Sequence, residues 1–278
     1  MNTQKRIVAI HDISCFGRCS LTVALPIISA AGIETSVIPT AVLSTHTGGF
    51  SDFTYRDLTD DILPIVKHWQ SLNLNFDAIY TGFLGSFEQI EIISQVFDML
   101  KTKDNLIIVD PVMADNGELY KIFTKDFPIG IKKLCQKADI LIPNLTEAAL
   151  LLEEPYKCGP YKKEYIEYML KKLSGLGCKK VVLTGVFFDE LNLGAAAYDA
   201  NTDEISYAFS PKISGYYHGT GDVFGSALTA SILKNKTLAQ SIKIAVEFTA
   251  KSIERTYHAK TDIRFGVNFE EGLQDLLK

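Results

Sequence analysis

Positive charge is not in surplus in this sequence. Its 278 residues include 28 lysines and arginines against 33 aspartates and glutamates, which gives a formal net charge of −5, and the basic residues are scattered along the chain. Proteins that bind nucleic acids present a basic face to the phosphate backbone. The composition therefore argues against a nucleic-acid partner and favours a small molecule.

Long apolar runs and paired cysteines are also missing. No apolar stretch approaches the roughly 20 residues that cross a bilayer, and the N-terminal segment MNTQKRIVAIHD becomes polar too early for a secretory signal. The five cysteines are an odd number without CxxC spacing, which favours reduced thiols over disulfides or structural zinc. We therefore expect a cytoplasmic protein with no membrane partner.

The sequence also lacks linkers, internal repeats and low-complexity segments. Hydrophobic residues make up 47% of the chain. A chain of this length and composition is able to bury one large core. We therefore predict a single domain that spans residues 1–278.

Short runs rich in Ile and Val alternate with longer amphipathic stretches, which is typical of βαβ units in a mostly parallel sheet. The predicted strands cover residues 6–10, 34–43, 76–82, 105–111, 138–144 and 179–185. The predicted helices cover residues 20–32, 55–72, 86–102, 122–136, 145–153, 161–175, about 221–234 and 238–257. The runs 194–200 and 204–210 are typical of an antiparallel hairpin at the sheet edge. The predicted fold class is therefore α/β.

Ligands of open α/β sheets bind beyond the carboxyl ends of the strands. Polar or conformationally special residues follow five of the predicted strands. They are His11-Asp12, Ser44–Gly49, Thr81–Phe83, Asp110-Pro111 and Pro143-Asn144. The chain has no GxxxxGK[ST] motif, and GTGDVFG misses the GxGxxG spacing by one residue. The five strand ends together are therefore the candidate site.

The segment HGTGDVFG, residues 218–225, places Asp222 behind two glycines at the predicted start of an apolar helix. Helix starts expose N–H groups that attract anions, and glycine allows an anion to approach the backbone. Taken alone, Asp222 is equally well explained as a helix cap. The alternative is a general base that takes a proton from a hydroxyl during phosphoryl transfer.

Asn144-Leu-Thr-Glu147 has the spacing of a capping box, and capping is the favoured interpretation of these four residues alone. A hydrated Mg²⁺ site is the alternative, because Mg²⁺ prefers a few carboxylates together with water and phosphate oxygens. Asp110 and Asp115 could supply the remaining negative charge. Asp110 equally fits a strand end before proline, and Ala114-Asp-Asn-Gly117 fits a turn.

In combination, these motifs resemble the ribokinase-like superfamily and, within it, the pyridoxal kinases of vitamin B6 salvage. The resemblance extends from Ile7 to about Tyr257 through AIHDISCFG, STHTGGF, YTGFLGS, VDPVMAD, IPNLTEAALL and HGTGDVF, in the same order. It implies a three-layer ribokinase-like fold, with helices on both faces of a mostly parallel sheet, and a homodimer. It also implies ATP-dependent phosphorylation of the 5′-hydroxymethyl group of pyridoxal, pyridoxamine or pyridoxine.

The resemblance also assigns roles to residues. Asp222 matches the catalytic base of the family, and its anion hole corresponds to Gly219, Thr220 and Gly221. The acidic positions that organise Mg²⁺ and a monovalent cation, usually K⁺, correspond to Asp110, Asp115 and Glu147. Nucleotide-binding positions correspond to Asn144 and Thr184, and positions around the pyridine ring correspond to Asp12, His46, Thr47 and Phe83. Apart from the resemblance, the position of segment 114–123 after Asp110 leads us to expect a flap that excludes water once ATP is bound.

Two residues depart from the family pattern. Asp12 replaces a common Ser, and Phe83 replaces a common Tyr. A carboxylate only accepts hydrogen bonds, whereas a hydroxyl also donates them, so the preferred vitamer is left open. Two other functions stay open as well. One is a hydroxymethylpyrimidine kinase of thiamine synthesis, which often has Cys where this chain has His218. The other is a non-catalytic B6-binding protein, which would need no base at Asp222.

Overall fold

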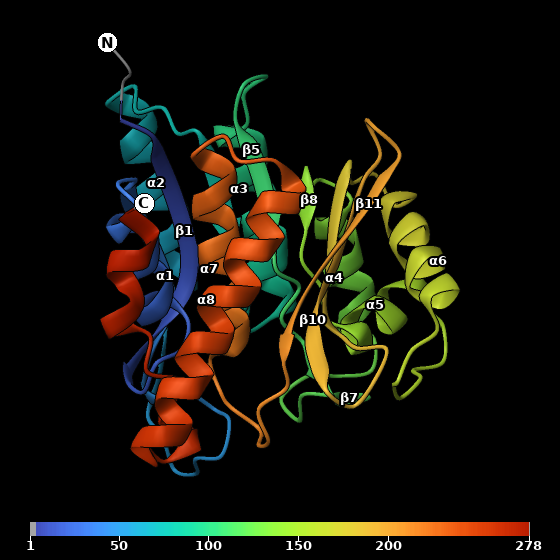
Figure 1. Cartoon of the computed structure of the whole chain (residues 1–278). Coiled ribbons are helices and arrows are strands. Elements are labelled where there is room, and N and C mark those ends of the chain that lie inside the picture. The colour runs from blue at the N-terminus through green and yellow to red at the C-terminus, as the bar shows by residue number, and fades with distance from the viewer. Residues whose placement is uncertain (1–3, 278) are drawn as a thin grey trace.

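The structure is a computed structural model that describes residues 4–277. Nine strands of the described chain form one sheet in the order β11-β10-β9-β8-β5-β4-β1-β2-β3 (Figure 1). They are β1 (Arg6–Phe16), β2 (Glu34–Thr45), β3 (Tyr55–Asp57), β4 (Ala78–Thr81), β5 (Leu106–Val109), β8 (Ile140–Leu141), β9 (Lys180–Val186), β10 (Asn192–Asp199) and β11 (Glu204–Pro211). The neighbours from β2 to β9 pair in parallel, which confirms the predicted sheet.

Helices cover both faces of this sheet. They are α1 (Leu21–Ala30), α2 (Thr59–Ser71), α3 (Phe87–Leu100), α4 (Phe127–Cys135), α5 (Leu145–Leu152), α6 (Lys163–Ser174), α7 (Thr220–Leu233) and α8 (Leu238–Ala259), followed by the short 3-10 helices η1 (Ile263–Phe265) and η2 (Glu270–Leu277). One core layer joins α2 to α6 to the sheet, and the other joins α1, α7, α8 and η2 to its opposite face. The predicted three-layer arrangement is therefore confirmed.

The central strands are mostly apolar because both of their faces are buried. In β1, Val8 and Ile10 belong to one core layer and Ile7 belongs to the other, and all three side chains are fully buried. In β4, Ile79 and Tyr80 point to opposite layers in the same way. These strands hold the site between two rigid layers.

Two further features of the chain bear on the sequence predictions. No helix within residues 4–277 has both the length and the apolar character needed to cross a bilayer. All five cysteines are free thiols, and Cys19, Cys135 and Cys178 are buried.

The predicted edge hairpin is confirmed, since β10 and β11 pair antiparallel and β10 also pairs antiparallel with β9. The predicted helix over 122–136 begins later, at Phe127. The expected flap segment 114–123 contains a second, small hairpin. Its strands are β6 (Ala114–Asp115) and β7 (Glu118–Leu119).

The prediction of a helix from residue 55 is wrong for its first turn. Tyr55–Asp57 forms the edge strand β3, which pairs antiparallel with residues 41–43 of β2, and α2 begins at Thr59. The carboxylate of Asp57 accepts a hydrogen bond from the Thr59 backbone N–H at 2.7 Å. This side-chain acceptor separates the strand from the helix.

The fully buried amide of Gln89 ties these elements together. Its nitrogen donates to the Thr40 backbone carbonyl and to the Thr59 hydroxyl, both at 3.0 Å, and its oxygen accepts from the Gly85 backbone N–H at 2.8 Å. One side chain in α3 therefore links β2, the start of α2 and the loop after β4.

We expect Gln89→Leu to lower the free energy of unfolding by roughly 2–4 kcal/mol, because two buried backbone groups lose their partner. The matched control is Gln70→Leu, in which an exposed glutamine loses one bond to the Met99 carbonyl. Denaturant titration of both variants gives the comparison. Equal, small losses in the two variants would contradict the role assigned to Gln89.

Candidate functional site

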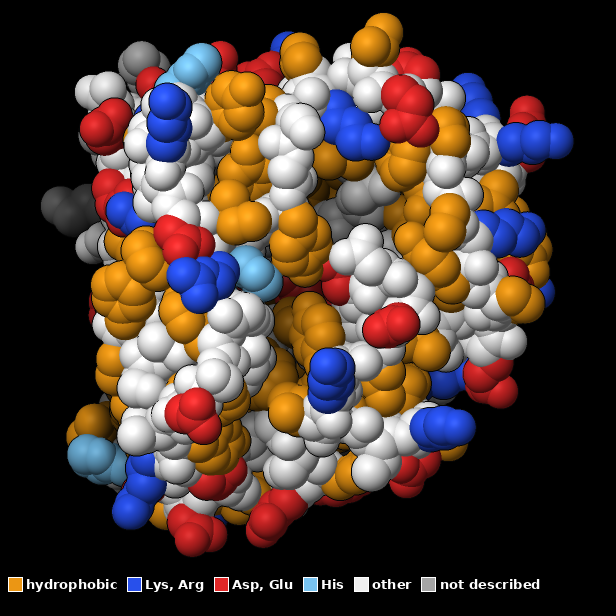
Figure 2. Space-filling model, turned by 90° about the horizontal axis from the view of Figure 1, so that it is seen from below, with side chains coloured by type: hydrophobic (Ala, Val, Ile, Leu, Met, Phe, Trp, Pro, Cys, Tyr) orange, Lys and Arg blue, Asp and Glu red, His pale blue; other side chains and the backbone are white. Residues whose placement is uncertain are grey.

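The carboxyl ends of the parallel strands meet at one edge of the molecule, which lies at the bottom of Figure 1. Figure 2 shows this edge from below, as a hollow with acidic side chains in its depth and apolar and histidine side chains around it. The predicted site residues lie on the segments that leave this edge. The fold therefore brings the predicted site residues to one edge of the sheet, and their roles stay predictions.

Helix α7 begins at this edge without a side-chain cap. Its N-cap is Gly219, with φ of 74° in the left-handed region, and within the described chain no side chain accepts a hydrogen bond from the helix start. The N–H groups of Thr220, Gly221 and Asp222 lie in the first turn, where no intrahelical acceptor exists. No described atom lies within 4 Å of a Cβ built at Gly221. The helix start is therefore open, and the interpretation of Asp222 as its cap is wrong.

Asp222 lies in the first turn of α7, half-buried. Burial raises the pKa of its carboxyl to about 7, and the negative charge of Asp12 raises it further, while a hydrogen bond from the Ser20 backbone lowers it. A carboxyl with a pKa near neutrality accepts and returns protons efficiently at physiological pH.

Asp12 lies at the bend of β1 and is only 4% exposed. Burial raises the pKa of its carboxyl, although hydroxyls of Ser20 and Ser14 stabilise the charged form. Its Oδ2 lies 3.5 Å from the Ser14 hydroxyl, and its Oδ1 has no hydrogen-bond partner among the described residues. Asp12 therefore presents an unused acceptor close to Asp222.

Glu147 and Asp110 form a second acidic pair, with 2% and 8% exposure. The Glu147 carboxylate accepts from the Asn144 backbone N–H at 2.9 Å and from the Met113 N–H at 3.1 Å. Burial nevertheless raises its pKa to about 8. The pKa of Asp110 is also raised, chiefly by burial and to a smaller extent by the negative charges of Glu147 and Asp222. The capping box predicted for Asn144 and Glu147 is confirmed, and it also holds the segment after Asp110.

Asp115 links the small hairpin to the segment before α7. Its Oδ2 accepts from the Tyr216 hydroxyl at 2.7 Å, and its Oδ1 accepts from the Asn116 N–H at 2.8 Å. Its charge also contributes to the raised pKa of Glu147. The Asp115–Tyr216 bond thus joins the small hairpin to the segment that precedes α7.

Five acidic side chains of the site have no basic partner in the described chain. They are Asp12, Asp110, Asp115, Glu147 and Asp222. Among residues 4–277, none of these five side chains takes part in an ion pair. No three His, Cys, Asp or Glu side chains in the described part converge into a ready metal cage. Such a set suits a hydrated cation that shares its ligands with phosphate oxygens.

The loop after β2 contains His46 and Thr47. The Nε2 of His46 donates to the Arg264 carbonyl at 2.6 Å, and its Nδ1 accepts from the Gly48 N–H at 3.1 Å. Burial lowers the pKa of His46, and its ring lies 5.1 Å from that of His218. His46 is therefore a neutral wall of the site with both nitrogens engaged, whereas Thr47 is exposed.

Phe83 is half-buried, and its ring lies 5.7 Å from that of Phe123. Thr184 in β9 pairs with Asn144 and lies beside Gly185, near which the described chain leaves open space. The Asn144 amide donates to the Ala114 carbonyl at 2.8 Å and accepts from the start of α5. Asn144 and Thr184 therefore lie together, but the Asn144 side chain is already occupied.

Two buried polar residues lie below the site: Tyr80, which sequence reasoning missed, and His11, which it named only as a strand-end residue. The hydroxyl of Tyr80 has no partner in the described chain, lies close to Gly225, and has its pKa raised by burial and by Asp110 and Asp222. Both ring nitrogens of His11 likewise lack partners there, and burial lowers its pKa to about 3. The only feature of the sequence that could have pointed to these two residues is their polarity within otherwise apolar strands.

Comparison with known proteins agrees with this geometry. Residues 25–265 match the family described as phosphomethylpyrimidine kinase. A Bacteroides thetaiotaomicron protein, provisionally named a phosphomethylpyrimidine kinase and crystallised with pyridoxal, is 38% identical over 99% of this chain and 96% of its own, with a TM-score of 0.94. The pyridoxal kinase of Lactobacillus plantarum is 30% identical over 99% and 97%, with a TM-score of 0.89.

A curated relative extends the similarity. The pyridoxal kinase of Dictyostelium discoideum is 26% identical over 276 residues, which cover 94% of this chain and 89% of that protein. The match to the family and the 30% identity to a pyridoxal kinase over nearly the whole chain together decide its relationship. This chain belongs to the ribokinase-like family of pyridoxal and phosphomethylpyrimidine kinases.

Proposed function

We propose that this protein transfers the γ-phosphoryl group of ATP to the 5′-hydroxymethyl group of pyridoxal, pyridoxamine or pyridoxine. The observation that carries the proposal is the carboxyl of Asp222, whose pKa is raised to about 7, in the first turn of an uncapped helix. This position puts a base beside free backbone N–H groups. Phosphoryl transfer requires such positioning and charge stabilisation more than covalent chemistry.

In the proposed reaction, the oxygen of the substrate hydroxyl bonds to the γ-phosphorus of ATP. Asp222 accepts the proton that this hydroxyl loses. The bond between that phosphorus and the β,γ-bridging oxygen breaks, and ADP leaves with the bonding electrons. The N–H groups of Gly219, Thr220 and Gly221 stabilise the charge on the transferring oxygens. The open space at Gly221 is where those oxygens would lie.

Mg²⁺ and a monovalent cation, K⁺, fit the donor set of the second acidic pair. Asp110 would hold Mg²⁺, which would neutralise charge on the triphosphate. Glu147 accepts two backbone N–H bonds, so it would act through a water molecule and by its charge. Asp115 would complete the acidic set once its bond to Tyr216 is exchanged.

The vitamer ring would lie between Asp12, His46, Thr47 and Phe83. The unused Oδ1 of Asp12 would accept from a ring N–H or a substrate amine. Asn144 and Thr184 would border the nucleotide, with Asn144 acting chiefly through the backbone that it positions. The family resemblance further supports a homodimer in the cytoplasm.

Phosphomethylpyrimidine chemistry is the second candidate function. The matching family bears that description, and a hydroxymethylpyrimidine/phosphomethylpyrimidine kinase of Aquifex aeolicus is 30% identical over 177 residues, 62% of this chain. The position that often holds Cys in that branch is His218 here, and its ring contacts those of His46 and Tyr216. This arrangement favours the B6 vitamers.

We expect ADP release from ATP–Mg²⁺ with pyridoxal, pyridoxamine or pyridoxine at a catalytic efficiency at least about tenfold above that with hydroxymethylpyrimidine, since one lost polar contact costs this much or more. Ribose serves as the negative control. Coupled ADP assays with the purified protein measure all five acceptors. Preference for hydroxymethylpyrimidine would select the second candidate. If none of the B6 vitamers and no hydroxymethylpyrimidine supports ADP release, both candidate functions are contradicted.

We expect Asp222→Asn to bind ATP and vitamer but to lose about 10²–10⁴-fold in turnover, because the amide cannot accept the hydroxyl proton. The exposed Asp104→Asn is the matched control and should keep wild-type turnover. Single-turnover kinetics together with calorimetric ligand binding separate the two effects. Turnover of Asp222→Asn within about threefold of wild type would remove general-base catalysis by this residue.

A further inference from the structure

The loop between β1 and α1 touches the start of α7 at successive residues. A Cβ built at Gly219 would lie 2.0 Å from the backbone oxygen of Arg18 and 3.4 Å from the Cys19 sulfur. The next residue, Ser20, donates its backbone N–H to Asp222 and has φ of 56°. The position of the helix start therefore depends on where this loop runs.

The C-terminal segment holds the same loop from the other side. The Arg18 N–H donates to the Phe265 carbonyl at 2.9 Å. A Cβ built at Gly266 would lie 2.5 Å from the Arg18 oxygen and 2.6 Å from its Cβ. The Arg18 guanidinium pairs with Glu270 at 2.5 Å. Arg18 thus lies between Gly266 and Gly219, with its carbonyl close to both.

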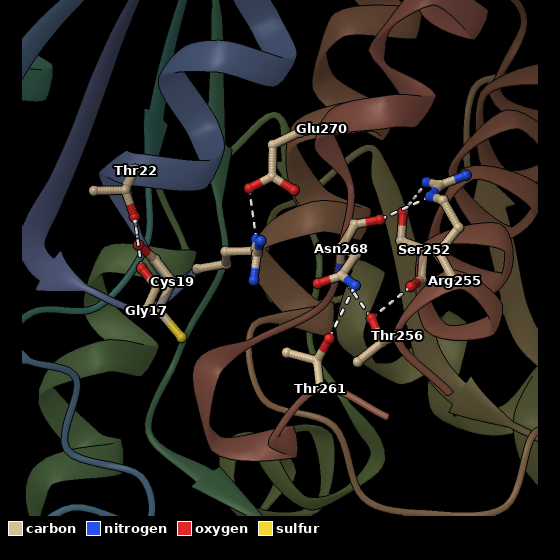
Figure 3. Close-up of polar contacts among 10 residues, drawn as sticks. Gly17, Cys19, Thr22, Ser252, Arg255, Thr256, Thr261, Asn268 and Glu270 are labelled. Atoms are coloured by element: carbon tan, nitrogen blue, oxygen red, sulfur yellow. Dashed lines mark hydrogen bonds and ion pairs between the residues drawn. The ribbon is translucent and has the colours of Figure 1, made fainter. Parts of the chain in front are cut away.

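Residues 262–270 are themselves anchored to α8. The Asn268 N–H donates to the Thr256 hydroxyl at 2.7 Å, and the Arg255 guanidinium donates to the Asn268 carbonyl at 2.8 Å. Figure 3 shows Asn268 between Arg255, Thr256 and Thr261, with Glu270 turned towards the loop that contains Gly17 and Cys19. The anchor is therefore continuous from α8 to the loop.

We infer that the C-terminal segment 262–270 is a clamp that sets the position of the phosphoryl-binding helix start, with Arg18 as the positioning residue that transmits its contacts to Gly219 and Asp222. The inference rests on the proposed function for its kinetic consequence. The contacts involve backbone atoms, so a side-chain rotation cannot relieve them. A displacement of Arg18 therefore displaces the helix start.

The decisive variant is Gly266→Ala, whose new Cβ would overlap the Arg18 backbone. Its control is Gly32→Ala. Gly32 has φ of 85°, close to the 81° of Gly266, but no described atom lies within 4 Å of its built Cβ. Both substitutions therefore strain a glycine with positive φ, and Gly266, whose ψ is 179°, carries additional backbone strain. Only Gly266→Ala also overlaps Arg18.

We expect Gly266→Ala to lower kcat about 10–100-fold with KM for ATP within about threefold, because misplacement by an ångström costs this much in rate. Amide hydrogen exchange at residues 223–225, whose N–H groups donate into the first turn of α7, should accelerate about tenfold as the helix start loosens. Gly32→Ala should leave both quantities at wild-type values. Wild-type exchange in Gly266→Ala, or equal effects in the two variants, would overturn the inference. Because exchange needs no turnover, an inactive wild type would remove the proposed function alone.

A second pair covers the case in which Gly266→Ala does not fold. Glu270→Gln removes the charge that pairs with Arg18. The control Asp275→Asn lies on the same 3-10 helix, η2, and removes the charge that pairs with Lys251 of α8 at 3.7 Å. We expect Glu270→Gln to lower kcat about two- to fivefold, the range of an exposed ion pair, and to accelerate amide exchange at residues 223–225. Asp275→Asn should change neither quantity. Identical behaviour of the two variants would contradict the clamp.

Discussion

Carboxyl groups held out of solvent without basic partners among the described residues are the constraint on which this site depends. Asp12, Asp110, Glu147 and Asp222 all have raised pKa values, with burial as the main cause. Carboxylates without partners in an apolar surrounding destabilise a fold. Four of them at one site therefore indicate a role in function and not in stability. Backbone N–H groups supply part of the compensation. A cation and the polar groups of substrates would supply the remainder when they bind.

The two layers of the fold explain how such a group is kept in place. The parallel strands end at one edge and are packed on both faces, so the residues that follow them have little freedom. Glu147 holds the segment after Asp110 through the Met113 N–H and caps its own helix through the Asn144 N–H, and the Ser20 backbone holds Asp222. Segments from the beginning, the middle and the end of the chain therefore define one site.

Much of this could be predicted from the sequence, because apolar runs and strand-end polar residues follow directly from a parallel sheet. The capping box at Asn144 was recognisable from spacing alone. The strand Tyr55–Asp57 was not, since its pairing depends on β2. Nor could spacing reveal that Gly219 faces Arg18 or that Tyr80 lies beneath two carboxylates, because these contacts join distant segments. The single-domain organisation and the residue roles stay predictions.

The pH dependence of kcat/KM for the vitamer, in wild type and in Asp12→Asn, tests the central claim most directly. Burial and the charge of Asp12 raise the pKa of Asp222 to about 7, and the base must be ionised to act, so wild-type activity should fall as pH decreases through about 7. Removing the Asp12 charge should move this acid limb to lower pH, and substrate ionisation is common to both profiles. An acid limb at the same pH in both proteins, or no acid limb at all, would contradict the account.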